Sequence, residues 1–205
     1  MKEYSVAMSL FDYLPVILFG IGAIIFQRDL YEKMGKGQFA LFAAGTIDVI
    51  AAGALKATYK LLYALGVCDF EPLNSMFFPV QSIGFLLAGL GIVAMLCYKP
   101  KKQTKALAVA APAVWKGTFL FVGLMVAGLA MMDFGFIKLA AKLKKKGTIV
   151  LIIISFICCM GMGYLSSKSF DKASMNWIAE GVNFVGQLTF LISAVSLHRA
   201  GLAKS

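Results

Sequence analysis

Long apolar runs separated by short charged segments constrain this chain more than any other feature. Six runs of 17 to 23 residues are each apolar enough to sit in hydrocarbon, and they lie at residues 10–26, 39–55, 76–98, 119–139, 148–165 and 177–198. An α-helix rises 1.5 Å per residue, so about 20 residues cross the roughly 30 Å core of a bilayer. We therefore expect an all-α integral membrane protein.

The composition supports this class. Of the 205 residues, 60% are hydrophobic and only 15% are charged. A soluble domain of this size would leave much of that apolar surface in water. With six or seven spans, no length remains for a separate soluble domain.

The net charge of +10 could indicate nucleic acid as a partner in a soluble protein. In a membrane protein, basic loops on the cytoplasmic side, next to anionic lipid, explain it better. The expected partners are therefore the lipid bilayer and a small polar solute, with no nucleic acid, and a homo-oligomer stays open.

The number of spans depends on residues 106–115, a run of only ten apolar residues after a basic stretch. If this run does not cross the membrane, the 20 Lys and Arg residues divide evenly, with 10 on each side. If it crosses as a short helix, 14 lie on the cytoplasmic side and 6 outside, with the N-terminus outside. The positive-inside rule favours the seven-span arrangement. Six spans arranged as 3+3 inverted repeats remain the alternative.

An internal repeat accounts for the order of the spans. At an offset of 110 positions, seven identities pair Phe26, Lys36, Gly37, Leu41, Ile47, Gly53 and Leu55 with Phe136, Lys146, Gly147, Leu151, Ile157, Gly163 and Leu165. At an offset of 102, Asp69 pairs with Asp171, and Gln81-x-x-Gly84 pairs with Asn183-x-x-Gly186. We expect a three-helix repeat at 1–98, a linker with a short apolar helix at 99–118 and a second three-helix repeat at 119–205.

This 3+1+3 layout of parallel repeats resembles the SWEET and PQ-loop transporter superfamily. The segment Phe26-Gln27-Arg28 is similar to its Pro-Gln turn, and the two amide-x-x-Gly stretches resemble its Asn-x-x-Gly signature. The resemblance implies that Gln81 and Asn183 contact a central substrate. It also implies an aromatic pocket residue on the second helix of each repeat, for which the second copy offers Tyr164. Trp177, at the start of the last run, is a further substrate-binding candidate.

Ionisable residues within the spans are candidates for coupling or gating. Charged side chains are costly inside a membrane, so they usually face a bundle interior or a cavity. Asp48 lies nine residues into its span, and its position in the second copy is occupied by Cys158. Glu180 and Asn183 share one face of the last helix with Gln187. Because Glu180 lies near the start of that helix, solvation at the interface stays open for it.

These residues predict a transporter that moves a sugar, a vitamin or an amino-acid-like solute by alternating access through a central site. Carboxamides suit this role because they both donate and accept hydrogen bonds without carrying charge. A receptor or partner-binding subunit that recognises a small ligand without moving it is the alternative. The chain lacks a C-x-x-C pair and has one histidine, so we expect no enzyme, no metal and no cofactor. The expected location is the plasma membrane, as in a bacterial inner membrane.

Overall fold

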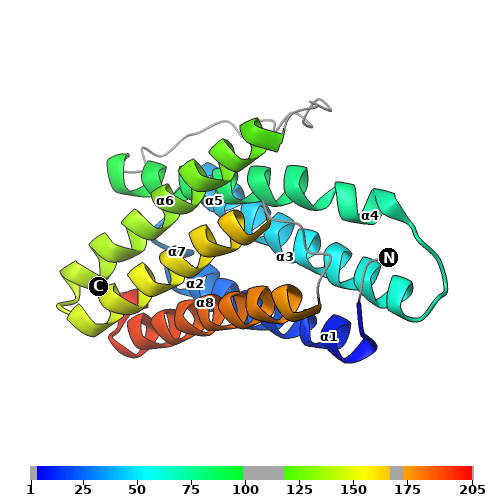
Figure 1. The fold of residues 1–205 in the computed structure, drawn as a ribbon. Coiled ribbons are helices and arrows are strands. Elements are labelled where there is room, and N and C mark those ends of the chain that lie inside the picture. The colour runs from blue at the N-terminus through cyan, green and yellow to red at the C-terminus, as the bar shows by residue number, and fades with distance from the viewer. Residues whose placement is uncertain (1–3, 99–117, 167–172, 205) are drawn as a thin grey trace.

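The computed structural model describes residues 4–98, 118–166 and 173–204, and within these ranges the chain is helical with no strand (Figure 1). Its helices are α1 (Val6–Phe11), α2 (Tyr13–Leu30), α3 (Lys36–Ala64), α4 (Glu71–Ser75), α5 (Phe77–Cys97), α6 (Thr118–Lys142), α7 (Lys146–Ser166) and α8 (Ala173–Arg199), followed by the 3₁₀ turn η1 (Leu202–Lys204). The predicted linker helix at 106–115 lies outside the described residues.

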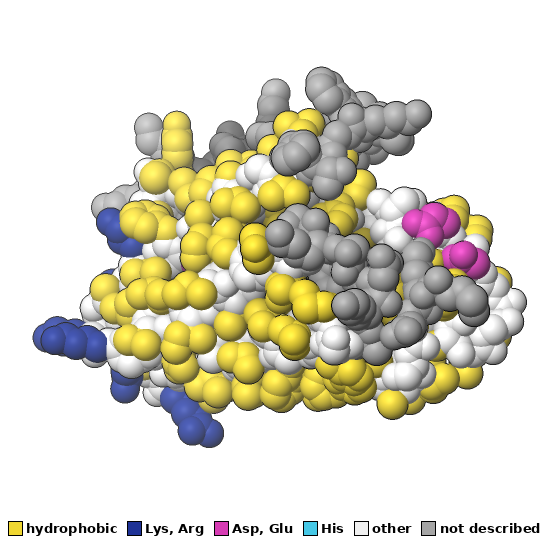
Figure 2. Space-filling model, viewed as in Figure 1, with side chains coloured by type: hydrophobic (Ala, Val, Ile, Leu, Met, Phe, Trp, Pro, Cys, Tyr) yellow, Lys and Arg dark blue, Asp and Glu magenta, His cyan; other side chains and the backbone are white. Residues whose placement is uncertain are grey.

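Five helical segments are long and apolar enough to cross a membrane: Val6–Leu30, Lys36–Ala64, Glu71–Cys97, Leu120–Lys142 and Ser174–Arg199. A shorter apolar helix, Lys146–Met162, accompanies them. Large apolar side chains such as Ile24 and Ile157 are more than half exposed, and yellow hydrophobic side chains cover most of the face in Figure 2. This surface fits a multi-pass membrane protein, because lipid rather than water can cover it.

Local sequence sets the ends of the long helix α3. At its start the backbone N–H of Gly35 donates a hydrogen bond to Gln38 Oε1 over 2.8 Å, as in a capping box. At its end the chain turns at Gly66, whose φ of 69° suits glycine. The helix continues beyond residue 55, which the predicted span was expected at least to reach, and ends at Ala64.

The six long helices form a closed ring in chain order. Each of α2, α3, α5, α6, α7 and α8 packs against the next, and α8 packs back against α2. The neighbours α3 and α5 are antiparallel: Gly45 lies against Gly84 and Ala88, whereas Gly91 lies against Gln38 and Phe42. Because a side chain at residue 45 would collide with the backbone of α5, the two helices can approach this closely only with glycine there.

Two pairs of neighbours run parallel. Gly128 of α6 lies against Phe85 and Leu86 of α5, and Gly135 lies against Ile92, so contacts on both helices advance together. In the same way Gly22 of α2 meets Phe190 of α8. Farther along, Asp29 meets His198. The described helices therefore point up, down, up in α2, α3 and α5, and again up, down, up in α6, α7 and α8.

Contacts between α3 and α5 recur between α7 and α8 at the offset positions. Gly84 faces the carbonyl oxygen of Gly45 and Cβ of Asp48, while Gly186 faces the carbonyl oxygen of Ser155 and Cβ of Cys158. Gln38 Nε2 donates to the carbonyl of Ala94 over 2.9 Å. At the paired positions, the hydroxyls of Thr148 and Ser196 are hydrogen-bonded over 2.6 Å. The two halves thus use matching contacts at positions that the sequence offsets pair.

Charge separates along the bundle. Basic residues near the C-terminal ends of α2, α6 and α8 (Arg28, Lys142 and Arg199) lie at one end. Glu71 opens α4 at the other. Figure 2 shows the same separation on its visible face, with Lys and Arg at the end that carries the C-terminus.

Candidate solute cavity

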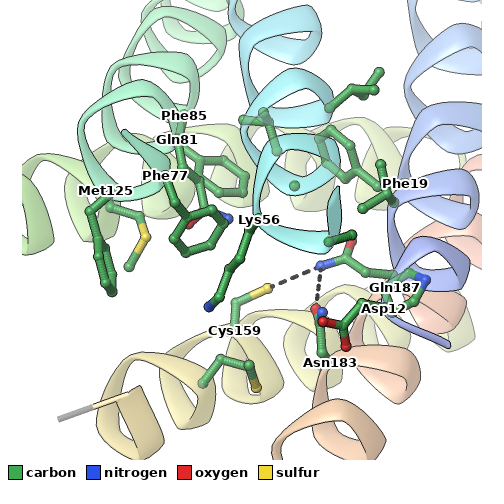
Figure 3. Close-up of a pocket in the computed structure, with 18 of the residues that line it drawn as sticks. Asp12, Phe19, Lys56, Phe77, Gln81, Phe85, Met125, Cys159, Asn183 and Gln187 are labelled. Carbon is green, nitrogen blue, oxygen red and sulfur yellow. Dashed lines mark hydrogen bonds between the residues drawn. The ribbon is translucent and has the colours of Figure 1, made fainter. Parts of the chain in front are cut away.

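A cavity of about 110 Å³ lies among all six long helices, between the middle of the bundle and its acidic end (Figure 3). The volume exceeds the 10–15 Å³ that one water needs and is below the 300–1,000 Å³ typical of sites for drug-sized ligands. The lining residues are Asp12, Pro15, Val16, Phe19, Val49, Ile50, Gly53, Lys56, Ala57, Phe77, Phe78, Gln81, Phe85, Met125, Leu129, Cys159, Met162, Glu180, Asn183 and Gln187.

Three carboxamides line the cavity from two helices that hold matching places in the two halves. Gln81 comes from α5, and Asn183 and Gln187 come from α8, one turn apart. Gln187 Nε2 donates to Asn183 Oδ1 over 3.5 Å and lies 3.9 Å from Cys159 Sγ. Gln81 makes no hydrogen bond within the described part of the chain. These amides therefore keep hydrogen-bonding capacity for a solute.

A buried ion triad borders the cavity at its acidic end. Lys60 Nζ lies 2.6 Å from Asp12 Oδ2 and 2.8 Å from Glu180 Oε1, and all three side chains are more than nine-tenths buried. Asp12 sits at the junction of α1 and α2, where the positive end of the α2 dipole favours a carboxylate. The triad joins α2, α3 and α8 across the place where the two halves meet.

Lys56 is the second cation at the cavity. It lies one turn before Lys60 on α3, and its ammonium sits 4.1 Å from the centre of the Phe77 ring, within the range of a cation–π contact. Among the described residues Lys56 forms no ion pair. Figure 3 shows its side chain pointing into the cavity.

Aromatic rings close the cavity toward the basic end. Phe19 stacks on Phe190 with 5.0 Å between ring centres and contacts Phe85 at 6.2 Å. Below them Phe26 stacks on Phe136, its partner at the offset of 110, with 4.0 Å between centres and 10° between planes. The five rings form an aromatic plug. Because Phe26 and Phe136 are offset partners in direct contact, they lie where an axis relating the two halves would pass.

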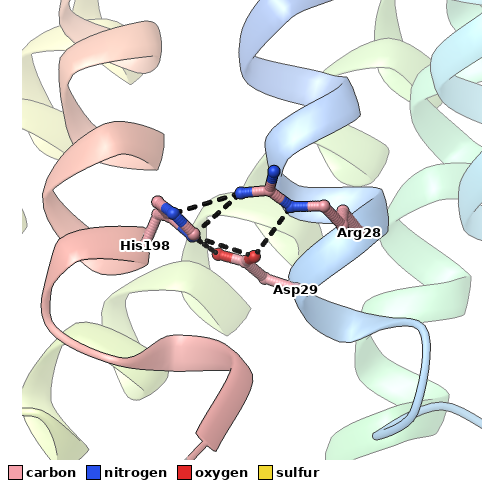
Figure 4. A network of polar contacts seen from close by, with 3 residues as sticks. All are labelled: Arg28, Asp29 and His198. Atoms are coloured by element: carbon pink, nitrogen blue, oxygen red, sulfur yellow. Dashed lines mark hydrogen bonds and ion pairs between the residues drawn. The ribbon is translucent and has the colours of Figure 1, made fainter.

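A second charged cluster joins α2 to α8 beyond the plug (Figure 4). His198 Nδ1 lies 3.0 Å from both carboxylate oxygens of Asp29 and donates to them when it carries its proton. The Arg28 guanidinium lies 3.1 Å from the imidazole and 3.6 Å from Asp29 Oδ1. The α2 and α8 helices are thus tied by charged groups at both ends.

The structure brings three of the six predicted site residues to the cavity, namely Gln81, Asn183 and Glu180. Asp48 instead lines a separate pocket with Pro79, Val80 and Ile83. Tyr164 is 64% exposed, and Trp177 is 45% exposed and packs on Phe11. These three lie away from the cavity because their positions on their helices face outward, which helical spacing alone did not establish.

Sequence reasoning missed Asp12, Lys56 and Lys60 as site residues. Lysines at the end of a span commonly extend toward the interface, but Lys60 is 5% exposed and paired with two carboxylates inside the bundle. Gly53, Lys56 and Lys60 do share one face of α3 by spacing. That pattern could have indicated an inward polar stripe, but its partners lie on other helices.

Asp133 is a further buried acidic residue, on α6. It is 4% exposed, and its Oδ2 has no hydrogen-bond partner in the described structure. Within the described residues, no group of three or more His, Cys, Asp or Glu side chains could hold a metal ion.

Comparison with known proteins identifies no relative of this chain. No protein-family model, curated protein or solved structure matches the chain. Functional inference therefore rests on the cavity itself.

Proposed function

We propose that this protein is a transporter that moves a small polar solute by alternating access through the cavity. The observation that carries the proposal is the position of the cavity, which is lined by both halves and holds a carboxamide from the third helix of each, Gln81 and Asn183. Rocking two repeats about a shared site is the general way in which such carriers expose a solute to each side in turn.

The helix directions support the seven-helix, 3+1+3 arrangement. Because α5 and α6 run parallel, Tyr98 and Thr118 belong to opposite ends of the bundle. The predicted 3+1+3 arrangement requires such a parallel course of α5 and α6, since a single crossing separates its two repeats. Inverted 3+3 repeats would instead require α6 to run antiparallel to α5. A parallel duplication also agrees with the resemblance to the SWEET and PQ-loop superfamily, which stays part of the proposal.

The charge separation supports a cytoplasmic basic end. The described lysines and arginines of the loops between α2 and α3 and between α6 and α7 gather there, as the positive-inside rule expects of cytoplasmic loops. The cavity then lies in the outer half of the membrane, and the aromatic plug separates it from the cytoplasm. This conformation corresponds to the outward-directed state of a carrier in the plasma membrane.

Uptake by the purified protein in liposomes tests the proposal. We expect accumulation of a small polar solute that falls at least about tenfold in Gln81→Ala and Asn183→Ala, since each loses a hydrogen-bonding group at the site. Thr189→Ala is the matched control, because its hydroxyl bonds to the backbone of its own helix and it does not line the cavity. Unchanged uptake in both amide variants would contradict the central site. Saturable binding without flux would favour the receptor alternative.

A further inference from the structure

Charged side chains line one part of the cavity wall, and apolar side chains line much of the rest. Asp12, Lys56 and Glu180 come from α2, α3 and α8. Opposite them, α5 and α6 contribute Phe77, Phe78, Phe85, Met125 and Leu129. The offset partner of Glu180 is Phe78, so the two halves supply different chemistry at matching positions. A solute that fits both sides must itself have an ionic end and an apolar end.

The charged side holds two carboxylate oxygens that no group in the described structure satisfies. Asp12 Oδ1 and Glu180 Oε2 are buried without a hydrogen-bond partner, although the other oxygen of each carboxylate binds Lys60. Lys60 contacts one oxygen of each carboxyl group, so the second oxygen of each remains available as an acceptor. Buried unpaired acceptors are costly, and a donor from a bound cation would satisfy them.

The same side holds a cation that has no ion-pair partner among the described residues. Lys56 lies over the Phe77 ring, and its charge lies within electrostatic range of Glu180, Asp12 and Lys60. An anion bound there would complete a neutral arrangement, in which two cations and two carboxylates of the protein meet one cation and one anion of the solute. An ammonium compound without a carboxylate would leave Lys56 unsatisfied.

We propose that the cavity takes a small zwitterion with an apolar body, of the kind represented by L-leucine. The solute ammonium binds the free oxygens of Asp12 and Glu180, its carboxylate binds Lys56, and its side chain lies against Phe77, Phe85 and Met125. Carboxamides of Gln81 and Asn183 then complete the hydrogen bonds of the carboxylate and ammonium groups. This inference rests on the proposed function, because it names the substrate class of that same cavity.

Binding to the purified full chain in detergent tests the inference, using titration calorimetry and thermal stabilisation. The probes are L-leucine, 3-methylbutylamine, which lacks the carboxylate, 4-methylpentanoate, which lacks the ammonium, glycine, which lacks the apolar body, and D-glucose. We expect L-leucine to bind at least about tenfold more tightly than each of the others, since each of them lacks at least one class of contact that L-leucine makes.

The variant Lys56→Met tests which end of the solute faces this lysine. Its affinity for L-leucine should fall about tenfold or more, while 3-methylbutylamine binding should be unchanged, because the amine has no carboxylate to lose. Lys138→Met is the matched control, since Lys138 also lies over a phenylalanine ring, at 5.2 Å from Phe134, and does not line the cavity. The half-buried Lys56 has no ion pair in the described chain, so its loss leaves no charge unpaired and the variant is expected to fold.

Failure of this inference is distinct from failure of the transport proposal. Tighter binding of D-glucose or 3-methylbutylamine than of L-leucine overturns the substrate class, as does the absence of binding by all five probes. Liposome uptake of another solute would then leave transport intact. Conversely, L-leucine binding that responds to Lys56→Met without any flux supports the substrate class and overturns transport.

Discussion

The two places where the halves of the molecule meet are built differently. Between α5 and α6 the helices touch through glycines: Gly89 faces Gly128, and a side-chain carbon at either position would collide with the opposite backbone. Between α8 and α2 the contact is made by aromatic rings, with Phe190 against Gly22 and Phe19. Charged groups tie this second joint at both ends, through the Asp12–Lys60–Glu180 triad and the Arg28–Asp29–His198 cluster.

The difference assigns a mechanical role to each joint. Close backbone packing allows little relative movement, because a shift of one helix meets the other at once. Ion pairs and stacked rings can exchange partners as two helices separate, so they form discrete closed and open states. In the proposed transporter, the α5–α6 joint would suit a hinge and the α8–α2 joint would suit the opening of the cavity.

The largest expected effect is at the charged joint. Lys60→Met leaves Asp12 and Glu180 buried without their cation, and losing one partner of a buried ion pair destabilises a protein by about 3–5 kcal/mol. The measurement is thermal unfolding in detergent, followed by size-exclusion chromatography. Lys138→Met, which removes a lysine from outside the cavity, is the control.

A second variant distinguishes the loss of charge pairing from a change in side-chain packing alone. Adding Glu180→Gln to Lys60→Met removes one of the two uncompensated charges and should recover part of the lost stability. Equal unfolding temperatures for wild type and Lys60→Met would show that the triad does not hold this joint.

An intermediate effect is expected at the glycine joint. Gly128→Ala places a Cβ against the backbone of Phe85 and Leu86, and such overpacking costs about 1–3 kcal/mol. Gly123→Ala, on the same helix, is the matched control because nothing lies within 4 Å of its new carbon. Thermal unfolding of the two variants compares them directly. If both behave alike, α5 and α6 are not held in close contact.

The smallest effects test whether the halves are equivalent. Thr148→Ala removes the hydrogen bond to Ser196, worth about 0.6 kcal/mol by the average for membrane helices. Gln38→Ala, at the paired position, should cost up to about three times as much, because the Gln38 side chain donates to the carbonyls of Ala94 and Tyr98 and accepts from the N–H of Gly35. Thermal unfolding measures both, with Thr189→Ala as reference. A loss in only one half would argue against matched contacts.

Helical class and pairing of positions could be predicted from the sequence, for reasons tied to particular residues. Apolar runs near 20 residues long can bury themselves only as membrane helices, and the described helices include five such segments. Gly84 and Gly186 are paired at the offset of 102, and the residues they contact are paired at the offset of 110. Small residues recur there because two backbones approach closely. Both features are local, so the order of residues alone carries them.

The sequence did not determine which side chains face the interior of the bundle. The sequence places both Glu180 and Asp48 within a span. In the structure Glu180 joins a buried triad, whereas Asp48 lines a separate pocket. The choice depends on the rotation of each helix within the ring, and that rotation is set by packing against neighbours rather than by the helix's own spacing. The same holds for Tyr164 and Trp177, because their aromatic character does not specify whether they face the bundle interior or its surface.

By itself the sequence determined that the chain forms apolar helices, that its two halves share a pattern of residues, and that the third helix of each half carries a carboxamide. Only the tertiary structure decided that Lys60 sits between Asp12 and Glu180, three residues from three helices separated by up to 168 positions in the chain. Ion pairs of this kind leave no periodic trace, because each partner is a single side chain on a different helix. The charged wall of the cavity exists only once the ring closes α8 against α2.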